Sequence, residues 1–121
     1  MSYLKNRARA FKCAFIGIGR LFSQEAHAKI HLFAAVCVIA AGLIFKIERW
    51  EWCAVLLCIG GVFMAEAFNT AVEKLADRIT RERNPLIGAA KDVAAGAVLL
   101  FVLASVAVGL VVFIPYFISL F

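Results

Sequence analysis

The sequence predicts an all-α membrane protein with one amphipathic surface helix followed by three membrane-spanning helices. Two observations carry this prediction. Of the 121 residues, 64% are hydrophobic and 17% are charged, and a mean hydropathy of +0.93 exceeds what one soluble core of this size can bury. The apolar residues also form long stretches, the last of which, 93–121, carries no charge. Because no repeat or low-complexity segment is visible, residues 1–121 are expected to form one domain.

Residues 1–24 are expected to lie along the membrane surface as an amphipathic helix. Apolar side chains recur at alternating spacings of four and three from Leu4 to Phe22, which is the period of one helix face. The other faces carry the basic side chains of Lys5, Arg7, Arg9, Lys12 and Arg20. Such a helix binds anionic lipid headgroups. These headgroups are therefore an expected partner, and no nucleic-acid partner is predicted.

The first span is predicted at about 30–47, and a polar segment precedes it. Ser23 is available as its N-cap, and Glu25 is the only acidic residue among the first 47. Glu25 alone also fits a solvated first-turn carboxylate favoured by the helix dipole. His27 and His31 share a helix face at a spacing of four, but a third ligand is missing, so no metal site is predicted from them.

A short turn with balanced charges and both Trp residues, 46–52, joins the first span to a second at about 52–72. Within the second span, Gly60 and Gly61 are expected to allow close approach of another helix. The four Cys residues show no CxxC or Cys/His spacing, so neither a disulfide nor structural zinc is predicted.

Pro85 is expected to end the second helix at or before Asn84. Residues 86–92 then read as a connector, and the third span covers about 93–117. Lys and Arg are concentrated before the first span and around this connector, whereas the turn between the first two spans holds only two. The positive-inside rule therefore places the N-terminus and the connector in the cytoplasm.

An acidic stripe emerges from the second apolar segment. Glu66, Asn69, Glu73 and Asp77 are spaced so that one helix turns all four to the same side. Glu66 has apolar neighbours on both sides, where an ionised carboxylate costs about 3 kcal/mol. It is therefore a candidate general base for a hydroxyl among lipid tails. The structural alternative is an interhelical hydrogen bond between Glu66 and Asn69 or Thr70 of a neighbour.

The predicted topology brings further charged residues to the same cytoplasmic end. Glu73 offers the hard oxygen ligands that Mg²⁺ prefers, and Glu25 is its candidate partner. Lys91, next to Asp92, offers a point charge for phosphate. A non-enzymatic alternative also stays open, in which the stripe lines a proton or cation path in a small transporter or regulatory subunit.

These residues form a pattern that resembles the bacterial integral-membrane diacylglycerol kinase and undecaprenol kinase family. The pattern is Glu66-x-x-Asn69-x-x-x-Glu73-x-x-x-Asp77, followed by Ala90-Lys91-Asp92 and the small residues Ala94-Ala95-Gly96-Ala97. The resemblance covers nearly the whole chain. It implies a homotrimer of the bacterial inner membrane, with composite active sites on the cytoplasmic side that transfer the γ-phosphoryl group of MgATP to a lipid hydroxyl.

The resemblance also implies a role for each site residue. Glu66 is expected to accept the lipid proton, and Glu25 and Glu73 are expected to bind Mg²⁺. The ATP site is expected to contain Glu25, Glu73, Asp77, Glu82, Arg83, Asn84, Lys91 and Asp92, with Asn69 in support. Many relatives have Tyr-His in place of Arg83-Asn84, and an expected nucleotide-contacting Arg is Arg7, Arg9 or neither. No GxxxxGK[ST] loop is present.

The lipid acceptor is the remaining question. The stretches 30–35 and 91–98 look more like the undecaprenol kinase branch. Undecaprenol is therefore the favoured acceptor, and diacylglycerol is the alternative.

Overall fold

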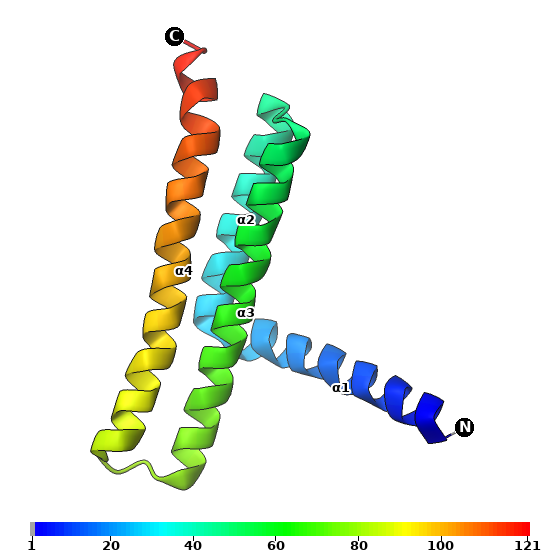
Figure 1. Ribbon diagram of the computed structural model, residues 1–121, viewed down its shortest axis with the longest axis vertical. Coiled ribbons are helices and arrows are strands. Elements are labelled where there is room, and N and C mark those ends of the chain that lie inside the picture. The colour runs from blue at the N-terminus through cyan, green and yellow to red at the C-terminus, as the bar shows by residue number, and fades with distance from the viewer. Residues whose placement is uncertain (1) are drawn as a thin grey trace.

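Four helices make up the computed structural model, which describes residues 2–121. They are α1 (Ser2–Gln24), α2 (Ala26–Phe45), α3 (Arg49–Ile79) and α4 (Pro85–Ile118). Figure 1 shows α2, α3 and α4 running alongside one another as a bundle, while α1 leaves the bundle sideways. Each bundle helix is long and apolar enough to cross a membrane. The predicted all-α membrane fold with three candidate spans is therefore confirmed.

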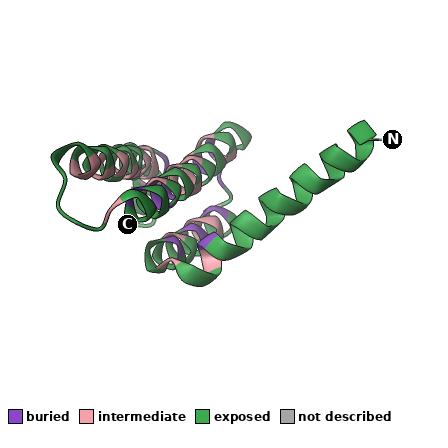
Figure 2. Cartoon of the chain, turned by 90° about the horizontal axis from the view of Figure 1, so that it is seen from below, coloured by how far each residue is buried: buried purple, intermediate pink, exposed green. Residues whose placement is uncertain are grey.

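α1 is attached to the bundle only by its last turns. Residues 2–20 are exposed, as Figure 2 shows by its green colour, and Leu21 is buried. The Phe22 ring meets the Phe63 ring of α3 edge to face, with 5.0 Å between their centroids. The expectation that Ser23 caps the next helix is wrong, because Ser23 still belongs to α1 and Glu25 takes the N-cap position of α2.

The turn between α2 and α3 is shorter than expected. We call the end of the bundle that contains this turn and the C-terminus the hairpin end. α2 ends at Phe45 because Lys46 adopts the left-handed conformation, with φ of 54°. Glu48 then caps α3 in a reciprocal capping box with Glu51. A Cβ added to Gly42 would lie 2.7 Å from the Trp52 ring, so the absence of a side chain lets the two helices touch.

The best-packed part of the bundle lies near the hairpin end. Val55 and Val112 are almost fully buried there. The carboxylate of Glu51, only 6% exposed, accepts hydrogen bonds from the Glu48 backbone N–H at 2.9 Å and from the Tyr116 hydroxyl. Because a buried carboxylate is stable only when its oxygens are paired, this contact ties the last turns of α4 to α3.

α4 begins earlier than the sequence pattern indicated. The Asn84 side chain accepts hydrogen bonds from the backbone N–H groups of Leu86 and Ile87 at 3.0 and 3.1 Å, and Pro85 occupies the first helical position. Proline fits that position because its missing N–H would be unpaired there. The expected connector over 86–92 is therefore wrong. The connector is 80–84, and it defines the connector end of the bundle.

The two adjacent glycines of α3 differ in their surroundings. A Cβ added to Gly61 would collide with the ring of Phe101 on α4. A Cβ added to Gly60 would meet no heavy atom within 4 Å. Close helix approach is thus confirmed at Gly61, whereas Gly60 faces open space.

Candidate functional site

Glu66 is the most deeply buried acidic residue of the described chain. It is 3% exposed although it lies in the middle of α3. Its Oε2 lies 3.6 Å from Nε2 of His31 on α2, and no other basic side chain among residues 2–121 lies within 4.0 Å of it. The pair is longer than a hydrogen bond. Glu66 therefore keeps capacity to accept a proton donor.

The next turns of α3 carry the acidic stripe outward. Asn69 is buried, and its Nδ2 donates to Glu73 Oε1 at 3.2 Å. Glu73 itself is exposed. Within residues 2–121, Asn69 Oδ1 and Thr70 Oγ1 are buried without a hydrogen-bond partner. The stripe therefore runs from buried side chains at Glu66 and Asn69 to an exposed one at Glu73.

One ion pair links α3 to α4 at the connector end. Lys91 Nζ donates to Asp77 Oδ1 at 2.6 Å, and both side chains remain partly exposed. The hydrogen bond from Lys91, together with the charges of Lys91 and Arg81, lowers the pKa of the Asp77 carboxyl against a smaller opposing effect of desolvation. Two residues of the expected ATP site are thus in direct contact.

Four further residues of the expected ATP site lie in the connector or near the start of α4. Glu82 and Arg83 are exposed in the connector, and Asp92 is exposed on the second turn of α4. Asn84 is exposed too, but its side-chain oxygen is occupied as the N-cap of α4. Their placement leaves the whole group open to water.

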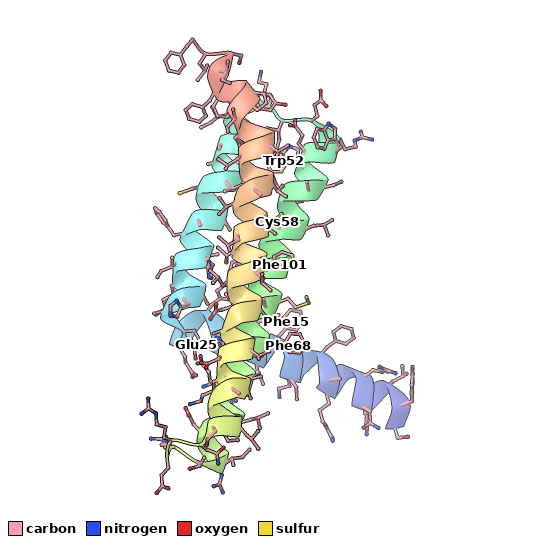
Figure 3. All side chains as sticks on the ribbon, turned by 60° about the vertical axis from the view of Figure 1, so that its left-hand side comes forward. Phe15, Glu25, Trp52, Cys58, Phe68 and Phe101 are labelled. Atoms are coloured by element: carbon pink, nitrogen blue, oxygen red, sulfur yellow. The ribbon has the colours of Figure 1, made fainter. Side chains whose placement is uncertain are left out.

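Glu25 is half-buried at the one-residue joint between α1 and α2, and its side chain makes no capping hydrogen bond. Figure 3 shows Glu25 and Phe68 at the same height along the bundle, and Phe68 is the α3 residue just before Asn69. Glu25 therefore lies at the level of the stripe.

No cluster of three or more His, Cys, Asp or Glu that could hold a metal is found within residues 2–121. Mg²⁺, however, is commonly held by one or two carboxylates together with substrate phosphates. Glu25 and Glu73, both incompletely buried, supply carboxylates of this kind. The donor chemistry fits a magnesium ion shared with a nucleotide.

The sequence pattern did not single out His31 as a partner of Glu66. Its i, i+4 spacing to His27 pointed to a helix face, whereas the contact with Glu66 depends on how α2 packs against α3. One signal was present, because His31 is the last ionisable residue before the uncharged stretch of the first span.

The site therefore has two sides. Towards the connector end it presents carboxylates together with Lys91 and Arg83, which are groups that can hold a metal and phosphates. Towards the hairpin end it borders apolar helix faces. Glu66 and His31 lie between these sides, where a water-soluble and a lipid-soluble reactant can meet.

Comparison with known proteins adds a family match. Residues 12–113 match the family model described as prokaryotic diacylglycerol kinase. An undecaprenol kinase of Bacillus subtilis is 39% identical over 107 residues, which cover 88% of this chain and 87% of that protein. A diacylglycerol kinase of Synechocystis is 34% identical over 112 residues, which cover 92% of this chain and 64% of that protein.

Proposed function

Because this chain belongs to the prokaryotic diacylglycerol kinase family, we propose that it transfers the γ-phosphoryl group of MgATP to the hydroxyl of undecaprenol. The protein is a lipid kinase, as both named relatives are. The choice of undecaprenol rests on the higher identity to the undecaprenol kinase, which this chain matches over nearly its full length. Diacylglycerol is the second candidate, since the family description and the other relative carry that name.

The observation that carries the mechanism is the buried Glu66 at the boundary between the polar stripe and the apolar bundle. The O–H bond of the alcohol breaks as its proton moves to a Glu66 carboxylate oxygen. The alcohol oxygen forms a bond to the γ-phosphorus, the bond from that phosphorus to the β–γ bridging oxygen breaks, and ADP leaves. Burial keeps water, a competing acceptor, away from Glu66.

The exposed residues hold the nucleotide. Lys91 exchanges Asp77 for a phosphate oxygen when ATP binds, and Asp92 and the connector residues Glu82 and Arg83 contact the nucleotide. When bound, Mg²⁺ would be held by Glu25 and Glu73 and would neutralise phosphate charge. Asn69 keeps Glu73 in place through its hydrogen bond.

The working form is a homotrimer in the bacterial inner membrane, with the N-terminus and the connector end in the cytoplasm. The trimer is what the resemblance to the diacylglycerol kinase and undecaprenol kinase family implies. The basic, amphipathic α1 lies on anionic headgroups at the cytoplasmic surface.

Transfer of labelled γ-phosphate from MgATP to undecaprenol and to diacylglycerol, assayed in parallel in mixed micelles, tests this proposal. We expect clear preference for undecaprenol and no transfer when Mg²⁺ is chelated. Preference for diacylglycerol would reassign the acceptor. Absence of transfer to either lipid by a folded, assembled protein would overturn the kinase proposal.

A further inference from the structure

An apolar cavity of about 230 Å³ lies between α2, α3 and α4. Along α3 it extends from Phe63 to Val55, which corresponds to about 12 Å of helix. Only two of its lining side chains, His31 and Ser105, contain nitrogen or oxygen. The cavity therefore offers an apolar ligand a space with one polar end, where His31 stands.

The His31 side chain at this polar end is also the one that pairs with Glu66. Nε2 of His31 and Oε2 of Glu66 are 3.6 Å apart, so a hydroxyl oxygen placed about 2.8 Å from each completes a triangle. In that position the hydroxyl donates to Glu66 and accepts from the imidazole N–H. The rest of the molecule then extends from His31 into the cavity.

We propose that this cavity binds the hydroxyl-bearing end of a prenyl alcohol, and that His31 positions its hydroxyl against Glu66. This inference rests on the proposed kinase function and adds the acceptor subsite. An apolar cavity of about 150 Å³ admits benzene, with six carbons. By that measure 230 Å³ admits roughly two isoprene units, and the remaining chain continues into the bilayer.

The lining favours a prenyl alcohol over a diacylglycerol. A diacylglycerol carries two ester groups close to its hydroxyl, and burying a polar group without a hydrogen-bond partner is unfavourable. Beyond His31 the cavity offers only the Ser105 hydroxyl, which has no hydrogen-bond partner within residues 2–121. A prenyl alcohol brings no polar group besides its hydroxyl, so it loses nothing on entry.

Two glycines provide a matched test of the cavity. Gly109 lines it, Gly60 does not, and a Cβ added at either position meets no heavy atom within 4 Å. Gly109→Leu should fill the space and raise KM for undecaprenol at least tenfold, while KM for ATP changes less than twofold. Gly60→Leu should leave both constants unchanged. The same KM for undecaprenol in Gly109→Leu and Gly60→Leu would overturn the assignment of the cavity as the acceptor subsite.

His31 is tested separately with its neighbour His27, which is exposed on the same helix. His31→Leu should lower kcat for undecaprenol at least tenfold without altering KM for ATP. His31→Gln keeps an N–H donor and should recover part of kcat, which a merely structural role does not predict. His27→Leu should behave like the wild type. Full activity of His31→Leu would remove His31 from the acceptor site.

A measurement without ATP covers the case in which a variant does not fold. Cys58 lines the cavity, whereas Cys53 is exposed outside it. Undecaprenol should slow modification of Cys58 by an apolar thiol reagent and leave Cys53 unaffected, each read in a protein with that cysteine alone. Equal rates with and without undecaprenol would overturn the subsite. Failure of wild-type transfer would instead overturn the kinase function itself.

Discussion

Lys91 on α4 donates a hydrogen bond to Asp77 on α3 at 2.6 Å, so the lysine expected to meet ATP is already paired within the chain. The pair joins the two helices beside the connector at 80–84. A phosphate group must therefore compete with the Asp77 carboxylate for the same ammonium group. Breaking the pair has consequences for stability as well as for nucleotide binding.

Stability should depend on pH through Asp77. Lys91 lowers the pKa of Asp77 below its ordinary value of 3.8. The pair therefore contributes stability above that pH, and the contribution is lost as pH falls through the lowered pKa. Asp77→Asn should lower Tm by a few degrees at most at pH 7, because the pair is exposed, and the difference from wild type should shrink below pH 3.8 and vanish once the Asp77 carboxyl is protonated. Thermal unfolding in micelles measures this, with Asp92→Asn as the unpaired control. A difference that persists at low pH would contradict it.

Replacing Glu66 should separate chemistry from assembly. Glu66→Gln keeps the size of the buried side chain but removes the proton acceptor, so phosphoryl transfer should fall by about 10²–10⁴-fold. Size-exclusion chromatography and Tm should be unchanged, and KM for ATP should stay within twofold of wild type. Undiminished turnover would remove Glu66 from the mechanism.

Asn84 offers a test of a structural against a binding role. Asn84→Ala removes the cap that accepts from Leu86 and Ile87 and should cost about 1 kcal/mol of stability. Asn84→Ser restores a capping oxygen and should recover most of that loss. If Asn84→Ala raises KM for ATP and Asn84→Ser restores it along with stability, then loss of the helix cap explains the effect on ATP binding. A raised KM in a fully stable Asn84→Ser would instead show direct contact with the nucleotide.

Tyr116 should matter for stability but not for transfer. Its hydroxyl donates to the buried Glu51 carboxylate at the hairpin end, whereas Lys91 lies near the other end of α4. Tyr116→Phe should lower Tm, because the buried Glu51 carboxylate loses a hydrogen-bond donor. Tyr3→Phe, at an exposed position of α1, is the control. A loss of kcat that exceeds the loss of folded protein would contradict this separation.

Local periodicity predicted most of the helical structure. The spacing of Glu66, Asn69 and Glu73 placed them on one face, and their graded burial agrees with it. The start of α4 was misplaced because Pro85 was taken as the end of one helix, when it also begins the next. Both interpretations of proline are allowed by its fixed φ and missing N–H.

Contacts between helices could not be predicted in the same way. Gly60 and Gly61 are adjacent and identical in sequence, yet only Gly61 faces Phe101. The pairing of His31 with Glu66 likewise depends on how α2 is rotated against α3. Periodicity gives the face of one helix, whereas the rotation between two helices is decided by side-chain packing along their whole length.

The sideways course of α1 gives a reference for the depth of the bundle in the membrane. With α1 in the headgroup layer, as proposed, the contact of Phe22 with Phe63 holds α1 about 4.5 Å of helix rise from Glu66. The depth of Glu66 beneath the lipid surface is then measured from α1 and not from the opposite leaflet. A change in bilayer thickness would then be accommodated at the hairpin end, and the proposed reaction at Glu66 would stay at the same depth below the cytoplasmic surface.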